Sequence, residues 1–443
     1  MRSRFPAFVL LLLIVFSSQS LYANTSRETL ARDAVSKDTS KSDQAIAELR
    51  SMGPAGLNSL FKTYEREINE QISNPLLAAT AEWQRLSRAL DAVSQQKDSY
   101  LAGLYWHTDL EQAKAAARQS GKPILSLRLL GKLTEEYSCA NSRFFRTILY
   151  SNEEVSKVLR NRFVLHWQSE RPAPRVTIDF GDGRKLERTL TGNSIHYILA
   201  ADGRPVDALP ALYGPRAFLR ALDLPKEAFG PAPKAGDLVL GSPSYPRQRL
   251  NAINVAWLVD IEKTGGKVPQ GFVVRRNTDG TPQALEIATL AMSKAITEVG
   301  ILRSMTASSV ALGTMTDEAA WNKIAQLHLA DAQLDSRSIG LIKRQTHKAL
   351  SSSPATSPHA ADQTLAALID KLQRNIALDT VRNEYLMHTK LYAWLLDDLA
   401  GTDLEKLNRK VYAELFLTPA SDPWLGLFSP DVYMALQNGG VVR

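Results

Sequence analysis

The sequence of 443 residues contains a single cysteine, Cys139, and this scarcity excludes an internal disulfide framework. The thiol is therefore either a buried, inert side chain or a free group kept for its reactivity. The sequence also lacks a glycine-rich phosphate loop, a Ser-His-Asp order and a paired-carboxylate signature. These absences argue against a nucleotide-dependent enzyme and a hydrolase, and they leave Cys139 as the main candidate for chemistry.

The first two dozen residues have the pattern of a secretory signal peptide. Arg2 and Arg4 form a basic start, residues 7–16 form an apolar core, and a polar stretch leads to Ala23. The pattern predicts cleavage after Ala23 and a periplasmic or secreted mature protein. An uncleaved anchor is the alternative, although the apolar core is about half as long as a bilayer-spanning helix. We expect no membrane span once residues 1–23 are removed.

Charge is nearly balanced along the chain. Lys and Arg number 53 against 46 Asp and Glu, a net charge of +7. Removal of residues 1–23 takes away two arginines, which leaves 51 basic residues and a net charge of +5. The basic residues form no tight cluster interleaved with aromatic residues, so we expect no nucleic-acid partner. The predicted partner is another exported protein.

Composition and periodicity divide the chain into segments of different character. In order, they are a signal peptide (1–23), a polar, flexible lead-in (24–43), a helical segment (44–97), an α/β domain (98–225), a Pro- and Gly-rich linker (226–247) and an all-α domain (248–443). The helical segment is interrupted at Gly53-Pro54 and resembles one HEAT-type helical pair. One such pair cannot bury its own apolar face, so we expect it to pack with a third helix.

The α/β domain has a recognisable order of elements. Strands are predicted over residues 124–129, 163–167 and 195–199, a hairpin over 175–190 turning at residues 181–183, a short helix over 216–222, and helix starts at 108–111 and 151–154. Cys139 follows the first strand and begins the next helix. Backbone N–H groups at a helix N-terminus favour a thiolate, as do the nearby Arg128, Arg143 and Arg146.

This order, with a cysteine opening the helix after a central strand, resembles the thioredoxin-like fold over residues 101–224. In bacterial members, C-x-x-C is followed by a Glu-Val and then a Phe-Val pair, which here are Glu154-Val155 and Phe163-Val164. The family's Gly-Thr-Pro segment corresponds to residues 192–194. The resemblance implies a thioredoxin-like middle domain between all-α N-terminal helices and an all-α C-terminal domain.

Two positions depart from the family pattern. Ser142 replaces the second cysteine, which makes the site C-x-x-S, and Ser194 occupies the position of the family's cis-proline. A cis bond before a residue other than proline costs about 3 kcal/mol, so the bond before Ser194 is predicted to be trans. Both departures argue against ordinary dithiol oxidoreductase activity.

Two functional hypotheses follow. In the first, Cys139 is the nucleophile of thiol-based redox work or partner capture, Ser142 donates a hydrogen bond to its thiolate, and Ser194 and Arg143 bind substrate. One thiol cannot complete a dithiol cycle alone, but it can form a mixed disulfide or a sulfenic acid. In the second, the domain is a catalytically inactive scaffold for protein interaction, and Cys139 only fills space.

The seven histidines are candidates for metal ligands or catalytic bases. Two pairs have ligand spacing on helices, namely Glu384 with His388 and His328 with Asp331, but ordinary packed helices have the same pattern. We therefore predict no metal site and no cofactor. His166 and His196 fall on separate strands, and we interpret them as structural or surface residues and not as bases for Cys139.

The C-terminal region is predicted to be helical throughout, with patterns over residues 250–262, 284–305, 317–334, 337–350, 362–377, 381–399 and 404–416. The linker contains the apolar run Leu238-Val239-Leu240, and the tail carries Trp424 and Phe428 among prolines. Such residues are not expected to be left in water. Linker and tail are therefore predicted to be docked, with Cys139 near the contact between the domains.

Overall fold

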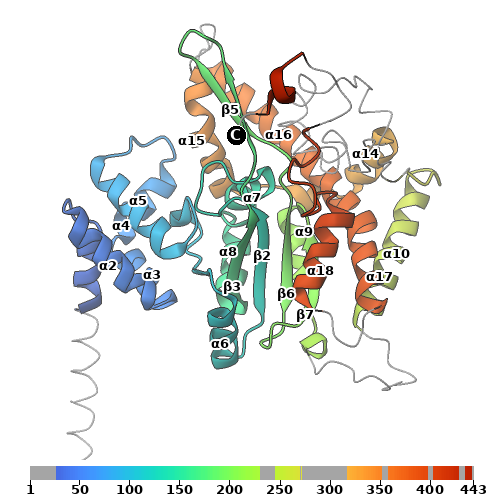
Figure 1. Ribbon diagram of the computed structural model, residues 1–443, viewed down its shortest axis with the longest axis horizontal. Coiled ribbons are helices and arrows are strands. Elements are labelled where there is room, and N and C mark those ends of the chain that lie inside the picture. Colours follow the sequence, from blue (N-terminus) through green and yellow to red (C-terminus); the bar gives the residue numbers. More distant parts are fainter. Residues whose placement is uncertain are drawn as a thin grey trace, which may run out of the picture. The chain divides into compact units, whose positions relative to one another are not determined.

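The computed structural model describes residues 26–229, 245–269, 271, 317–351, 358–397, 403–428 and 435–441. They belong to two compact units, Met1–Trp106 and His107–Arg443. Figure 1 shows their helices and strands coloured along the chain. The predicted helix over residues 284–305 and the apolar run at Leu238 lie outside the described residues.

The first unit is helical. Its elements are α2 (Thr39–Ser51), α3 (Pro54–Thr63), α4 (Glu65–Ser73), α5 (Ala81–Ser94) and the 3₁₀ turn η1 (Ser99–Leu101). The predicted break between α2 and α3 is confirmed, because Gly53 has a φ of 67° and Pro54 is the first residue of α3. The third predicted helix is α5, whose Leu86 and Leu90 are buried with Leu57 and Leu60 of α3.

The expected flexibility of residues 24–43 is wrong for the part that the structure describes. Residues 26–34 form a helix, and α2 already begins at Thr39. The reason is that small apolar side chains pack despite the polar composition, since Ala31 and Ala34 are 0% exposed. The next turn is held by Arg85, whose Nε donates to the Val35 carbonyl at 2.9 Å.

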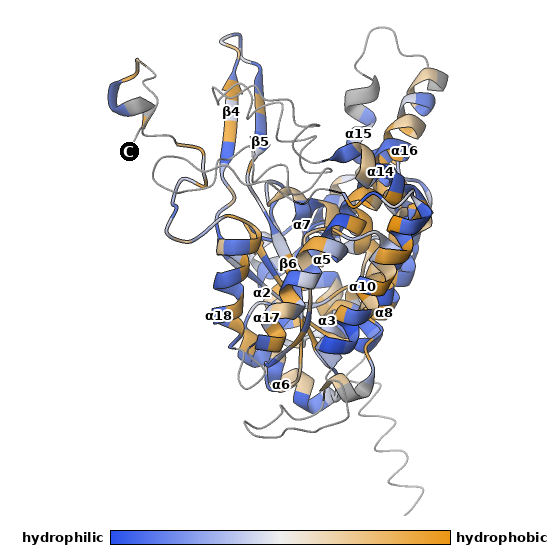
Figure 2. Ribbon diagram, turned by 90° about the vertical axis from the view of Figure 1, so that its right-hand side faces the viewer, coloured by the Kyte–Doolittle hydropathy of each residue, from blue (hydrophilic) through white to orange (hydrophobic). Residues whose placement is uncertain are grey.

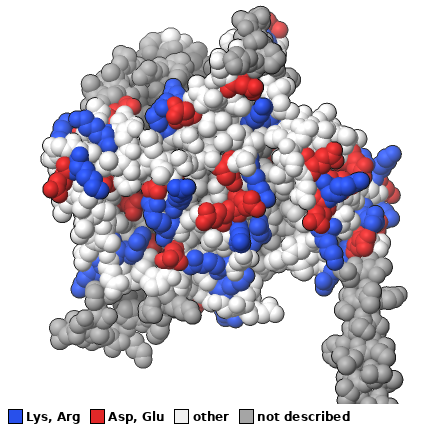
Figure 3. Space-filling model, turned by 180° about the vertical axis from the view of Figure 1, so that it is seen from behind, with Lys and Arg blue, Asp and Glu red and all other residues white. Residues whose placement is uncertain are grey.

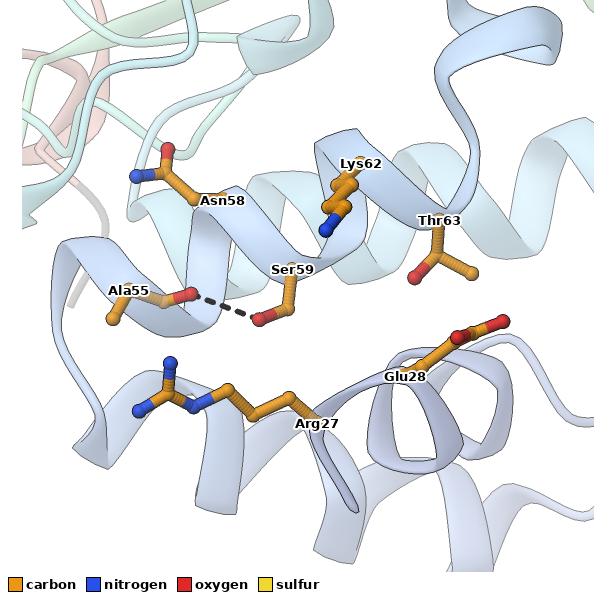
Figure 4. Close-up of a pocket in the computed structure, with 7 residues that line it drawn as sticks. All are labelled: Arg27, Glu28, Ala55, Asn58, Ser59, Lys62 and Thr63. Carbon is orange, nitrogen blue, oxygen red and sulfur yellow. Dashed lines mark hydrogen bonds between the residues drawn. The ribbon is translucent and has the colours of Figure 1, made fainter. Parts of the chain in front are cut away.

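A cavity of about 460 Å³ lies between the 26–34 helix and α3. Figure 4 shows Arg27 on one side of it and Lys62 on the other, with the Ser59 hydroxyl donating to the Ala55 carbonyl at 2.9 Å. Its lining residues are Arg27, Glu28, Ala55, Asn58, Ser59, Lys62 and Thr63. This cavity lies in the first unit and contains none of the residues predicted to carry function.

The second unit is built on a mixed five-stranded sheet with the order β1-β3-β2-β6-β7. The strands are β1 (Trp106–His107), β2 (Ile124–Leu130), β3 (Val164–Arg171), β6 (Ser194–Leu199) and β7 (Pro205–Pro210). Strand β2 is parallel to β3 and antiparallel to β6. Every residue of β2, β6 and β7 is buried, as expected for strands covered on both faces.

Helices from two parts of the chain accompany this sheet. From the α/β region they are α6 (Leu110–Ser120), α7 (Ala140–Phe144) continued by the π-turn η2 (Phe145–Leu149), α8 (Glu153–Arg162), α9 (Pro215–Ala221) and the 3₁₀ turn η3 (Lys226–Phe229). The predicted strands and helix starts are confirmed, since Asp109 and Asn152 cap α6 and α8. The sheet with its helices bears out an α/β middle region.

The C-terminal helices belong to the same unit. They are α10 (Tyr245–Lys263), α14 (Glu318–Leu327), η4 (Leu329–Ala332), α15 (Ser336–Ser351), α16 (Pro358–Arg382), η5 (Asn383–His388), α17 (Thr389–Asp397), α18 (Leu404–Lys410), η6 (Val411–Leu415) and η7 (Gln437–Gly440). Figure 1 shows α17 and α18 beside β6 and β7. The helical patterns that fall on described residues are confirmed with two differences. The patterns over 362–377 and 381–399 form one uninterrupted run from α16 to α17, and the pattern over 317–334 is divided between α14 and η4.

Strand β7 was not predicted. Its sequence begins and ends with proline and carries Asp207 in the middle, which is a poor strand pattern. Proline is tolerated because β7 lies at the edge of the sheet, where it pairs only with β6. Asp207 is tolerated because helices from the C-terminal region supply hydrogen-bond donors to its carboxylate.

The described part of the tail is held differently from the prediction. Trp424 is 47% exposed, and the residue buried in its place is the neighbouring Leu425, at 4%. The tail is tied to the sheet by Arg171, which donates to the carbonyl groups of Thr418 at 3.0 Å and Asp422 at 3.1 Å. Docking thus depends on backbone carbonyl groups that a pattern of apolar residues cannot reveal.

Within the described ranges, every helix is too short or too polar to span a lipid bilayer. On the face drawn in Figure 3, Lys and Arg side chains are intermingled with Asp and Glu. That face therefore presents neighbouring charges of both signs and not one extended basic surface.

Candidate functional site

Cys139 lies at the point where the chain leaves the central strand β2 and begins α7. Its backbone N–H donates to the Leu130 carbonyl at 3.1 Å, which fastens the start of the helix to the end of the strand. Cys139 is the N-cap of α7, and its sulfur accepts from the backbone N–H of Ser142 at 3.5 Å. The predicted place of the cysteine at a helix N-terminus is therefore confirmed. The side chain itself is 0% exposed.

The hydroxyl closest to the sulfur comes from Ser194 and not from Ser142. Ser194 Oγ lies 3.0 Å from Cys139 Sγ. The predicted bond from the Ser142 hydroxyl to the thiolate is wrong, because that hydroxyl lies 2.6 Å from Ser138 Oγ and 2.9 Å from the Cys139 carbonyl oxygen. A serine inside the first helical turn commonly bonds a preceding carbonyl group in this way. The described residues contain no cis peptide bond, so the bond before Ser194 is trans as predicted.

The loop before β6 approaches Cys139 very closely at Gly192. A Cβ atom added to Gly192 would lie 2.1 Å from Cys139 Cβ and 2.9 Å from its Cα. Only glycine fits here, because real Cβ atoms do not approach other heavy atoms so closely. The loop therefore forms one wall of the cysteine environment, and there is no space for a substrate between them.

The arginines near Cys139 in sequence hold the surrounding structure. Arg143 Nη1 donates to the Ser138 carbonyl at 2.7 Å and lies 2.5 Å from Thr189 Oγ1. Arg146 donates to the Glu135 carbonyl at 3.0 Å. These bonds fix the loop between β2 and α7, so Arg143, predicted to bind substrate, is committed to the protein's own backbone.

Residues 403–422, which we call the strap, cover one face of the sheet. Arg128 of β2 is 0% exposed, and its guanidinium contacts Glu405 of α18 at 2.5 Å and Glu170 of β3 at 3.2 Å. On the same face, the Tyr197 hydroxyl donates to Asn408 Oδ1 at 3.1 Å. The buried cation explains why this face needs acidic and amide partners from the strap.

The strap then reaches the loop beside Cys139. The Tyr412 hydroxyl donates to the Asn193 carbonyl at 3.2 Å, and Asn193 Nδ2 donates to the Phe416 carbonyl at 3.5 Å. Asn193 lies between Gly192 and Ser194, the two residues that contact Cys139. The cysteine therefore lies near the contact between the sheet and the C-terminal helices, as the sequence predicted. Tyr412 itself was missed, because nothing in its local sequence indicates a partner 219 positions away.

The two strand histidines are buried, which corrects the surface interpretation and keeps the structural one. His166 Nδ1 lies 2.8 Å from Ser126 Oγ, and His196 Nε2 lies 2.7 Å from the Tyr150 hydroxyl. Burial lowers the pKa of each imidazole to about 3, so both are neutral at physiological pH. One ring nitrogen of each takes part in a hydrogen bond within the fold.

A second buried cluster surrounds Asp207 of β7. His388 Nε2 lies 3.0 Å from Asp207 Oδ1, and the hydroxyl groups of Tyr245 and Tyr392 donate to the carboxylate at 2.5 and 2.8 Å. Burial alone would raise the pKa of Asp207, but these hydrogen bonds and the His388 charge outweigh it and hold the pKa below its usual range. His388 thus pairs with a sheet residue and not with Glu384, four positions earlier on the same helical face.

The other pair with ligand spacing, His328 and Asp331, belongs to a network of charges. His328 Nδ1 lies 3.4 Å from Asp331 Oδ2, while its Nε2 lies 2.6 Å from Asp260 of α10. Arg220 of α9 holds Asp331 through two bonds at 2.5 and 2.6 Å. Among the residues that the structure describes, no group of three or more His, Cys, Asp and Glu side chains is arranged to hold a metal ion.

This network predicts a loss of stability at alkaline pH. The pKa of His328 is raised, mainly by its hydrogen bond to Asp331 and also by Asp260. Its stabilising contribution is therefore complete below the unfolded value of about 6.5 and disappears as pH rises through the higher folded value. Between pH values of about 6 and 8.5, we expect the free energy of unfolding to fall by about 1 kcal/mol. A partly exposed ion pair contributes a free energy of this size.

Urea unfolding of the wild-type protein and of the His328→Gln variant, at pH values of about 6 and 8.5 on either side of the histidine range, measures this effect. In the variant, the free energies of unfolding at the two pH values are expected to be nearly equal. An unchanged difference in the variant would show that His328 is not its source.

Comparisons with protein-family models, with curated proteins and with solved structures found no match for this chain. Its function must therefore be argued from its own residues.

Proposed function

We propose that this chain is an exported thioredoxin-like protein that acts as an interaction module, with Cys139 as a buried structural thiol. Its partner in this proposal is another exported protein of the periplasm or the extracellular space. The signal-peptide pattern before Ala23 supports export. The complete burial of the thiol favours the scaffold hypothesis over the enzymatic one.

The thioredoxin-like part of the proposal is supported by the arrangement around Cys139. The cysteine opens the helix that follows β2, and β2 is the middle strand of the five-stranded sheet. The Asn193-Ser194 segment, which corresponds to the family's proline segment, approaches the sulfur. Both features are what the resemblance implies.

The observation that carries the scaffold hypothesis is that other segments of the same chain cover Cys139. Cys139 is 0% exposed, Gly192 lies against its Cβ, and Tyr412 of the strap holds the same loop. A partner disulfide cannot reach the sulfur unless the strap and the 192–194 loop move. Thiol exchange requires direct attack by the sulfur, so the closed state cannot perform it.

Thiol chemistry is the second candidate, and one observation favours it. The Ser142 N–H and the Ser194 hydroxyl lie 3.5 and 3.0 Å from the sulfur, where they can stabilise a thiolate. A mixed disulfide would form by attack of this thiolate on a partner disulfide, with release of the partner's other sulfur as a thiolate. This candidate requires a populated open state of the strap.

Reaction of the full-length mature protein with an aromatic disulfide probe separates the two candidates. For the scaffold, we expect Cys139 to react only as fast as the protein opens, with rates that rise when urea is added. Rapid reaction of the native protein, with a pH profile that gives a thiol pKa well below about 8.5, would contradict the scaffold and support thiol chemistry.

The Tyr412→Phe variant tests whether the strap controls this opening. It removes one hydrogen bond to Asn193, worth about 1 kcal/mol, so the native-state reaction is expected to be about fivefold faster. Tyr105→Phe is the matched control, because it removes a tyrosine bond to a carbonyl group, that of Arg50, within the first unit. Equal rates for the wild type and Tyr412→Phe would show that the strap does not shield Cys139.

A further inference from the structure

The hairpin β4 (Arg175–Asp179) and β5 (Lys185–Thr189) forms a two-stranded sheet of its own. Figure 2 shows the two strands side by side, projecting away from the five-stranded sheet. Phe180, next to the turn, is 55% exposed. An isolated two-stranded hairpin is only marginally stable in water, so such a hairpin gains from an additional strand.

The hairpin has two outer edges, one on β4 and one on β5. Leu190 N–H donates to the Pro174 carbonyl and Phe180 N–H to the Arg184 carbonyl, which identifies the even-numbered residues of β4 as those that face β5. Arg175, Thr177 and Asp179 therefore turn their backbone N–H and C=O groups to the other side. No third strand joins this sheet in the described part of the chain, so these groups form a row available for strand pairing.

The β4 sequence, Arg-Val-Thr-Ile-Asp, is complementary to itself when read antiparallel. With Thr177 opposite Thr177 of a second copy, Arg175 lies opposite Asp179 at both ends. The even residues bring Val176 opposite Ile178 on the other face of the sheet. Opposite charges and apolar side chains thus match in one register, and a shift by one residue would destroy both matches.

Strand β5 does not have this property. Its centre, Glu187, would lie opposite Glu187 of the second copy, and like charges directly opposite each other are destabilising. Within the hairpin, Asp179 also contacts Lys185 at 3.2 Å, so pairing through β4 would produce an alternating row of charges from Lys185 to Asp179 and on to Arg175 of the second copy.

We propose that β4 is a self-association edge through which two copies of this chain form a continuous four-stranded antiparallel sheet. The occupant of the edge is the β4 strand of a second copy, placed by a two-fold axis at Thr177. The contact is small compared with stable dimer interfaces of about 1,200–2,000 Å², so the association is weak and concentration-dependent. It is independent of the state of Cys139.

Cysteine cross-linking in the full-length mature protein tests the register. Thr177→Cys places two thiols opposite each other on the axis, within the Cα separation that a disulfide bridges. We expect a disulfide-linked dimer to accumulate under mild oxidation. Lys185→Cys is the control on the same hairpin, because the two copies of residue 185 are separated by both β4 strands. Cys139 is 0% exposed, so the wild-type chain provides the background.

A charge-swap pair tests the complementarity. Arg175→Asp and Asp179→Arg each place like charges opposite each other twice, and self-association measured by sedimentation is expected to fall by about tenfold. An equimolar mixture of the two variants restores opposite charges at both positions and is expected to recover dimers. Equal cross-linking of Thr177→Cys and Lys185→Cys, or monomeric wild-type protein at every concentration with no Thr177→Cys dimer, would overturn the proposal.

Discussion

Replacing Gly192 with alanine is expected to lower the free energy of unfolding by about 3 kcal/mol, at the upper end of the range for overpacked sites. The added Cβ would lie 2.1 Å from Cys139 Cβ and 2.9 Å from Cys139 Cα, so the backbone of the loop or of α7 must move. Backbone movement here also disturbs Asn193, which the strap holds through Tyr412. Denaturant unfolding gives the free energy, and the aromatic disulfide probe reports the accessibility of Cys139, which is expected to rise.

Two controls locate the cause of this effect. Gly271→Ala is expected to be nearly neutral, because nothing lies within 4 Å of a Cβ at that position. Adding Cys139→Ala to Gly192→Ala is not expected to restore stability, because the clash involves Cβ, whereas the sulfur would be 3.5 Å away. A Gly192→Ala variant within about 0.5 kcal/mol of the wild type, the range of ordinary surface substitutions, would show that the loop moves away at little cost.

Replacing Asp207 with asparagine is expected to lower the free energy of unfolding by about 3 kcal/mol, because a neutral amide replaces a buried carboxylate that accepts several hydrogen bonds. The Asp207 and His388 side chains are 0% and 1% exposed, so the His388 ring would lose its carboxylate partner at a position that water does not reach. The Tyr245 and Tyr392 hydroxyl groups would also lose a charged acceptor. The variant therefore weakens the attachment of the C-terminal helices to β7.

Acid unfolding provides an independent readout of the same carboxylate. The folded pKa of Asp207 is lowered, so its contribution is complete above the unfolded value of about 3.9 and is lost as pH falls through the lower folded value. The wild type is expected to lose this stability below about pH 4, whereas Asp207→Asn lacks it at every pH. Asp182→Asn, which removes an exposed pair with Arg184, is the control and is expected to leave stability nearly unchanged. Equal effects of the two substitutions would contradict the role of the buried pair.

Several elements of this protein could be predicted from the sequence because their causes are local. Asp109 and Asn152 each accept from the backbone N–H group three positions further on, and Gly121 ends α6 with a positive φ of 68°. The run from Ile124 to Leu130 is apolar enough to form a strand covered on both faces. The place of Cys139 between that strand and a helix depends only on such neighbours.

Other elements depend on partners that are distant in the chain, and only the tertiary structure decided them. Residues 26–34 have a polar composition, yet they form a helix whose alanine side chains are buried. Strand β7 contains a buried carboxylate that depends on donors from distant parts of the chain, such as His388, 181 positions away. A local pattern contains no information about such a contact, because its free energy depends on both partners and on their burial together.

The cysteine site shows the same division. The sequence by itself determined that Cys139 caps a helix after a central strand, because caps and strands are properties of short segments. Only the tertiary structure decided that Ser194 and not Ser142 presents its hydroxyl to the sulfur, and that Gly192 and the strap enclose it. Whether a thiol can react depends on its exposure, and exposure is set by every segment that packs around it.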